Sequence, residues 1–273
     1  MTAVGTEADQ LGRIEAFLDA VPRAAADVEQ HGALTLFVSR IPYRFYGRPR
    51  LGLAHDVGAD DVAAVRARQR ELGVREAFEW VHETTPSLAG AAQAAGLAVE
   101  QVPLLALEPA DAVPAPAPAG VSVRMLHAED AGLAAAQGAV ELAFAAPGMA
   151  IGPAGAAERD VAVAGLRDLG FLRDRLRRGL TAVAVAEDAD GALAAGTYHR
   201  AGEVAELMGV GTVPSARRRG IGAAVTARLV ADARDRGARL VFLSASDDEV
   251  ARVYERIGFR RVGTACFGRP AAR

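Results

Sequence analysis

The feature that most constrains this chain is the stretch EPADAVPAPAPAG, residues Glu108–Gly120. Alternating proline and alanine favour an extended polyproline conformation and cannot continue a helix or the middle of a sheet. The stretch therefore predicts a semi-rigid spacer between two folded parts. At 273 residues the chain is long enough for two domains, each with its own core. We place them at residues 1–108 and 121–273, with residues 109–120 as the linker.

Composition excludes several classes of protein. All 31 basic residues are arginine, so no lysine can form a Schiff base, bind pyridoxal phosphate or serve a Walker phosphate loop. The only cysteine, Cys266, excludes an internal disulfide framework and a multi-cysteine metal site, and we expect no bound metal. A net charge of −3 argues against a nucleic-acid partner recognised through bulk basicity.

The sequence also predicts where the protein works. No run of 18 apolar residues lacks charges, so we expect no membrane span and no membrane partner. The segment Met1–Gln10 carries two acidic residues and no basic ones, which argues against a secretory signal. We therefore expect a cytoplasmic protein.

In residues 121–273 the pattern alternates between strand and helix. Helices are indicated by apolar residues at helical spacing and by the glycines that follow them, such as Gly237 and Gly258. The segment Ala146–Gly155 holds two prolines and three glycines and is expected to be a loop. The predicted fold class is α/β with a mixed sheet. We expect strands at 121–125, 181–186, 192–200, 204–213, 240–243 and 259–267, and helices at 128–145, 157–178, 221–236 and 246–257.

The N-terminal part repeats some of this order. It has a helix at 60–72, a strand at 76–82, a helix between Pro86 and Gly96, and a strand at 98–107. Gly73 and Gly96 precede Gly237 and Gly258 by nearly the same number of residues. This spacing suggests an internal duplication.

The strongest site signal is VGTVPSARRRGIGA, residues Val210–Ala223. A strand runs into Pro214, and Arg217-x-x-Gly220-x-Gly222 then opens a helix. Successive backbone N–H groups at a helix N-terminus bind anions, and the glycines let phosphate oxygens approach the backbone. Three consecutive arginines add positive charge, so the pattern indicates a pyrophosphate. A Rossmann loop needs Gly-x-Gly-x-x-Gly and a Walker loop needs lysine, and neither fits.

This motif resembles the acyl-CoA-binding motif of the GNAT superfamily, the acetyl-CoA-dependent N-acetyltransferases. Downstream, Tyr254-Glu-Arg-Ile-Gly258-Phe259 is similar to that family's Tyr-x-x-x-Gly-Phe signature. The resemblance covers residues 121–267 and implies a GNAT-like acyltransferase fold there. The N-terminal part resembles a smaller, degenerate GNAT-like domain. Because residues 49–61 lack the motif, we expect that copy not to bind CoA.

The resemblance also implies roles for individual residues. The backbone of Val210, Gly211 and Thr212, with Val213 beside them, would pair with the pantetheine arm of acetyl-CoA, the co-substrate. A backbone N–H near Val210 would stabilise the developing oxyanion. Tyr254 would protonate the leaving thiolate. The pyrophosphate would be held by the turn that starts at Arg217 and by the amides of Arg218, Arg219, Gly220, Ile221, Gly222 and Ala223.

The general base is open between two residues. Glu206 lies on the strand that leads into the turn, where family members often place a base, and His199 lies on the preceding strand. The family often has an asparagine about seven residues before the tyrosine, whereas this chain has Asp247. An ionised carboxylate cannot donate hydrogen bonds, so we do not assign Asp247 to the CoA site.

We expect an N-acetyltransferase that moves an acetyl group to a primary amine by direct attack in a ternary complex. The acceptor would be a small molecule or a peptide. A non-catalytic acyl-CoA sensor or partner-binding module is the alternative, and a nucleotide-binding protein without CoA chemistry fits the turn less well. The sequence leaves the oligomeric state open, with a homodimer as one option.

Overall fold

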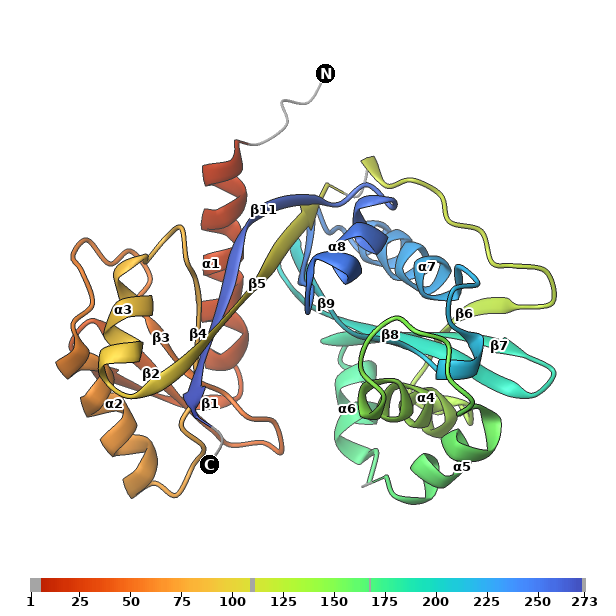
Figure 1. Ribbon diagram of the computed structural model, residues 1–273, viewed down its shortest axis with the longest axis horizontal. Helices are drawn as coiled ribbons and strands as arrows, with labels where there is room; N and C mark the ends of the chain where they lie inside the picture. The colour runs from red at the N-terminus through yellow and green to blue at the C-terminus, as the bar shows by residue number, and fades with distance from the viewer. Residues whose placement is uncertain (1–5, 109–110, 167, 272–273) are drawn as a thin grey trace. The chain divides into compact units, whose positions relative to one another are not determined.

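The computed structural model describes residues 6–108, 111–166 and 168–271. The chain divides into two compact units of mixed α/β structure (Figure 1). Unit 1 comprises residues 1–105, 244–247 and 261–273, and unit 2 comprises residues 106–243 and 248–260. Within the described ranges, no helix is both long enough and apolar enough to cross a membrane.

Unit 1 is built on a mixed sheet with the strand order β1-β2-β3-β4-β11-β5. The β1–β2, β2–β3 and β4–β11 pairs are antiparallel, and β3–β4 is parallel. Its elements are α1 (Glu7–Arg23), β1 (Ala26–His31), β2 (Leu34–Ser39), β3 (Gly47–Pro49), α2 (Ala59–Glu71), β4 (Phe78–Val81), α3 (Ser87–Ala94), β5 (Leu97–Leu107) and β11 (Arg260–Pro270).

Apolar side chains that alternate along β4 explain the core of unit 1. Phe78 and Trp80 point to the same face of the sheet, where they pack in one cluster with Val62 and Val65 of α2 and Leu88 of α3. All five side chains are fully or almost fully buried. Burying a large apolar side chain stabilises the fold by about 1.5–3 kcal/mol.

The last strand of the chain, β11, belongs to the sheet of unit 1. Ala265 pairs with Val81 and Gly268 pairs with Phe78 of β4, and Cys266 lies in the core cluster of unit 1. The linker-based division placed this strand with residues 121–273. The difference arises because strand pairing joins segments that are distant in sequence, and a linker says nothing about which sheet the chain's end completes. Cys266 is a buried free thiol, as expected for a small hydrophobe.

Unit 2 has the strand order β10-β9-β8-β7-β6. Helices α7 and α8 lie on one face of this sheet and α4, α5 and α6 on the other (Figure 1). All pairs are antiparallel except β9–β10, which is parallel. The elements are β6 (Ser122–Leu126), α4 (Leu133–Ala145), α5 (Ala156–Ala164), α6 (Gly170–Arg177), β7 (Thr181–Asp188), β8 (Gly191–Ala201), β9 (Val204–Thr212), α7 (Ile221–Asp235), β10 (Leu240–Ser244) and α8 (Asp248–Glu255).

Most of the predicted elements are confirmed, with three differences. The predicted helix 157–178 is two helices, because the chain turns at Gly165 and the carboxylate of Asp168 accepts a hydrogen bond from the Gly170 N–H. The predicted helix 128–145 begins only at Leu133. The sequence pattern predicts no element before residue 60, where the structure has α1 and strands β1 to β3.

The order α2-β4-α3-β5 in the first half repeats as α7-β10-α8-β11 in the second, as the suggested duplication requires. Gly73, Gly96, Gly237 and Gly258 end the four corresponding helices, and all have positive φ, between 65° and 104°. Left-handed backbone is costly for residues with a Cβ. Each glycine therefore marks a turn that a larger residue would strain.

Candidate functional site

The predicted phosphate-binding turn leads into α7 in unit 2. Arg218 and Gly220 both have left-handed backbone, with φ of 64° and 81°, and Gly220 caps the 15-residue helix. Such turns aim successive N–H groups toward one point, where the positive end of the helix dipole adds to their field. The turn is exposed from Arg218 to Gly220. A Cβ on Gly222 would lie 3.3 Å from the Thr212 hydroxyl, so that glycine keeps the backbone close to β9.

Arg217 does not take the place expected for it. The residue is only 9% exposed, and its guanidinium donates to the carbonyl oxygens of Ala143, Ala146, Ala150 and Thr212. These bonds use four of its five N–H groups. The side chain is therefore committed to the protein backbone, and the positive charge available to a ligand comes from its neighbours.

Arg218 and Arg219 are the exposed arginines of the turn. Arg218 forms an ion pair with Glu249 at 3.2 Å, in which both side chains are about three-fifths exposed. Exposed pairs of this kind contribute about 0–1 kcal/mol, so an anionic ligand can replace the carboxylate at low cost.

The edge of β9 is open on the side that faces β10. The two parallel strands pair only at Val204, Ala205 and Glu206, although β9 continues to Thr212. From Leu207 onward β9 pairs with β8 alone. A strand edge of this kind can take an extended ligand as an added strand. Val210, Gly211 and Thr212 lie on this part of β9, whereas Val213 is buried and its N–H donates to the Leu193 carbonyl.

A β-bulge interrupts β9 at the same place. Thr197 pairs with Met208 and Ala195 pairs with Gly211, so both Gly209 and Val210 face the single residue Gly196. A Cβ on Gly196 would lie 2.9 Å from the Val210 side chain, and Gly209 has a φ of 59°. A bulge leaves one residue outside the ladder and turns its backbone groups. This geometry suits the predicted oxyanion donor near Val210.

Tyr254 lies on α8 with its ring edge-to-face against Phe259, the two centroids 5.9 Å apart. Burial raises the pKa of its hydroxyl to about 12. The hydroxyl is therefore protonated at neutral pH, as a proton donor must be.

The two candidate bases lie opposite each other. Glu206 of β9 and His199 of β8 form a register pair, so they share a face of the sheet. Glu206 also pairs with Phe242, where the β9–β10 pairing ends. Burial, aided by Arg175, lowers the pKa of His199 to about 4. The imidazole is thus neutral at pH 7 but a weak base, which favours Glu206.

The corresponding place in unit 1 is occupied by the protein's own carboxylate. Gly58 is the N-cap of helix α2, and its N–H donates to the Asp61 carboxylate at 3.0 Å; the Ala33 N–H donates to the same group. A carboxylate at a helix N-terminus takes the position that an anion would fill. This supports the expectation that the N-terminal copy does not bind CoA.

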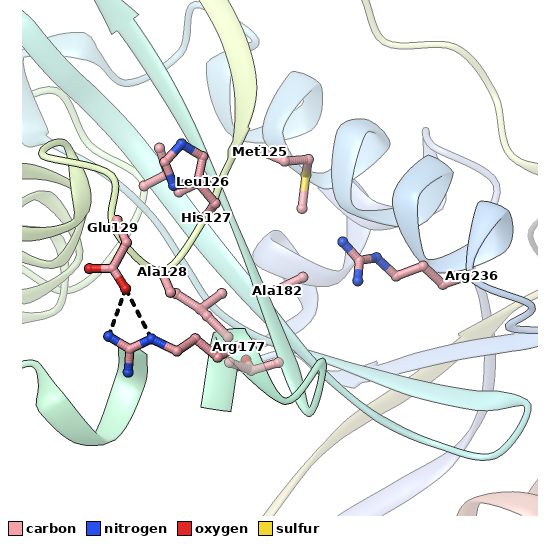
Figure 2. A pocket seen from close by; sticks show the side chains of 10 residues that line it. Met125, Leu126, His127, Ala128, Glu129, Arg177, Ala182 and Arg236 are labelled. Carbon is pink, nitrogen blue, oxygen red and sulfur yellow. Dashed lines mark hydrogen bonds and ion pairs between the residues drawn. The ribbon is translucent and has the colours of Figure 1, made fainter. Parts of the chain in front are cut away.

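Unit 2 also has a cavity of about 390 Å³ that none of the predicted site residues lines. Its wall joins the end of β6 to the start of β7 and helix α6, and Figure 2 shows Arg177 paired with Glu129 at its rim. Arg236, on the opposite side in Figure 2, is bonded to Asp232 at 2.8 Å. Both cations are thus already neutralised.

Fold and site together describe an α/β protein in which a strand with an open edge leads, through a left-handed turn, to the N-terminus of a long helix. Residues 151–259 match the model of the acetyltransferase (GNAT) family. The chain therefore contains a GNAT domain, which includes the turn, the open β9 edge and Tyr254. No curated protein matches the sequence.

Solved structures share the fold over the whole chain. A GCN5-related N-acetyltransferase from Kribbella flavida is 23% identical, with a TM-score of 0.70 over 99% of this chain and 98% of that one. A conserved protein of unknown function from Staphylococcus epidermidis is 12% identical, with a TM-score of 0.61 over 94% of this chain and 98% of that one. A tandem GNAT protein from the clavulanic acid biosynthesis pathway is 14% identical, with a TM-score of 0.55 over 96% of this chain and 95% of that one. The predicted α/β fold class with a mixed sheet and a GNAT-like fold is confirmed.

Sequence reasoning missed two parts of the site. Gly196 and Gly209 lie inside strands, which is the usual sign of a bulge and could have indicated one. The carbonyl partners of Arg217 had no signal, because three of them lie about 70 residues earlier in the chain.

Proposed function

We propose that unit 2 transfers an acetyl group from acetyl-CoA to the primary amine of a small molecule or a peptide. The carrying observation is the continuity of two features: the open edge of β9 runs from Leu207 to Thr212 and ends at the left-handed turn that opens α7. An extended arm with a pyrophosphate at one end matches this arrangement. Val210, Gly211 and Thr212 would pair with the pantetheine, and the amides of residues 218–223 would hold the pyrophosphate.

The residues around the bulge supply the chemistry. An N–H released from the ladder near Val210 would stabilise negative charge on the thioester oxygen, an effect that is typically worth about 3–4 kcal/mol. Glu206 would take the proton of the attacking amine, directly or through water. Tyr254 would donate to the leaving sulfur. Attack in a ternary complex needs no covalent enzyme intermediate, consistent with the burial of Cys266.

Calorimetric titration with acetyl-CoA tests the binding step. We expect one site per chain, because the Asp61 carboxylate already fills the corresponding place in unit 1. Gly222→Glu should abolish binding, since its carboxylate would lie among the amides that hold the pyrophosphate. Gly12→Glu is the matched control: it makes the same charge change on α1, where a Cβ meets no atom within 4 Å.

A screen of primary amines for release of free CoA then tests catalysis. Release of CoA by wild type, with a lower rate in Glu206→Gln, supports the proposed acetyltransferase activity. Binding at one site without turnover on any amine or peptide would favour the alternative, an acyl-CoA sensor. Absence of binding by folded wild-type protein would remove both readings.

A further inference from the structure

Arg217 ties together two segments that the proposed reaction uses separately. Its Nη2 donates to the carbonyls of Ala143 at 3.0 Å and Ala146 at 2.5 Å, its Nη1 to Ala150 at 3.1 Å, and its Nε to Thr212 at 3.3 Å. Thr212 ends β9, and the other three residues lie at the end of α4 and in the loop after it. All four acceptors are backbone carbonyl oxygens.

A cation stabilises the C-terminal end of α4. The last carbonyls of a helix have no partner within it, and they carry the negative end of the helix dipole. Arginine near a helix C-terminus can satisfy them. The loop 146–155 has no charged side chain of its own, so Arg217 brings this charge from a segment far away in sequence.

The loop also contacts the turn through its own backbone. The Gly152 N–H donates to the Pro214 carbonyl at 3.2 Å, and the Ser215 N–H donates to the Ala154 carbonyl at 2.9 Å. A Cβ on Gly152 would lie 3.1 Å from Pro214 Cβ. The two segments are therefore packed backbone against backbone, with Arg217 as the side chain that links them.

An exposed aromatic residue lies in the same segment. In the sequence, Phe144 lies between Ala143 at the end of α4 and Ala146 just after it, whose carbonyls Arg217 binds, and Phe144 is 63% exposed. Its ring reaches within 3.7 Å of where a Cβ on Gly211 would be. Arg217 thus binds the chain on both sides of an apolar side chain that reaches the face of β9 covered by α4.

We propose that Arg217 is a positioning residue that couples the phosphate-binding turn to the loop 146–155. This inference rests on the proposed function, because the loop is taken as a wall of the acceptor site. The exposed residues Arg218, Arg219 and Gly220 follow Arg217 in the chain. A ligand that fixes the amides of these residues also fixes Arg217, and through it the end of α4 and the loop. By linkage, an ordered loop strengthens cofactor binding to the same degree.

Hydrogen exchange of the backbone amides in residues 143–155 measures the coupling without an acceptor. Wild type is compared with Arg217→Gln and Arg217→Lys, and with Arg219→Gln as the control that removes a neighbouring exposed charge. In the ligand-free proteins, the amides of this segment should exchange about tenfold faster in both Arg217 variants than in wild type. A tenfold faster exchange means that the free energy of local opening is lower by ~1.4 kcal/mol. Lysine should not rescue, since one ammonium cannot reach four carbonyls. Amides of β7 and α7 report whether the fold is intact.

Saturating acetyl-CoA should slow exchange of residues 143–155 in wild type and in Arg219→Gln, but not in Arg217→Gln. A purely structural role would leave this ligand response in place and so would overturn the coupling. A third result is that Arg217→Gln weakens acetyl-CoA binding more than Arg219→Gln does, while hydrogen exchange of residues 143–155 stays unchanged. Arg217 would then be a pyrophosphate ligand, and the coupling would be overturned. If wild type binds no acetyl-CoA, the proposed function fails with the coupling; if it binds and the loop does not respond, only the coupling fails.

Discussion

Tyr254→Phe removes one oxygen atom and leaves the packing of the ring on Phe259 in place. The size of the effect follows from acidity. With a pKa of about 12, the Tyr254 hydroxyl is a weaker acid than an ordinary thiol of pKa about 8.5, so complete proton transfer to a free thiolate would be uphill by about 5 kcal/mol. The hydroxyl therefore helps mainly through a hydrogen bond to the developing thiolate. We expect kcat to fall about 10²-fold, the lower end of the range for acid catalysis.

The assay is release of free CoA, followed with a thiol reagent at saturating amine. Cys266 is fully buried and burial raises its thiol pKa to about 12, so the enzyme adds little background. The KM for acetyl-CoA and the melting temperature should stay near their wild-type values. If kcat of the variant stays within threefold of wild type, Tyr254 has no part in the mechanism. If instead the KM for acetyl-CoA rises about 10²-fold, Tyr254 is a binding residue.

Three further predictions concern other positions. Gly222→Glu should abolish acetyl-CoA binding by calorimetry, and retained affinity would contradict the assignment of the turn. Tyr198→Phe breaks a 2.6 Å hydrogen bond to the Asp232 carboxylate and should destabilise the protein by about 1.5–3 kcal/mol in urea unfolding while kcat is unchanged. His199 has a folded-state pKa below its unfolded value, so the unfolded chain binds the extra proton and stability falls as pH drops from about 6.5 to about 4. In His199→Gln the free energy of unfolding should fall by up to about 3 kcal/mol less than in wild type over this pH range. An equal fall in both proteins would refute the burial argument.

Much of the site was predictable because it is local. The turn from Arg217 to Gly222 combines residue types whose backbone freedom and charge act within a few positions, and in the structure it leads directly into α7, as expected. The strands and helices around it follow from alternation, helical spacing and glycine stops. The repeat was visible for the same reason, since its glycines end helices in both halves.

Long-range pairing decided the rest. The sequence alone determined two α/β halves, one turn rich in arginine and glycine before a helix, and a tyrosine downstream of it. Only the tertiary structure decided that β11 completes the sheet of unit 1, that β9 leaves β10 after Glu206, and that Arg217 faces carbonyls rather than a ligand. Hydrogen bonds between distant segments depend on how whole elements pack, and no local residue pattern encodes their partners.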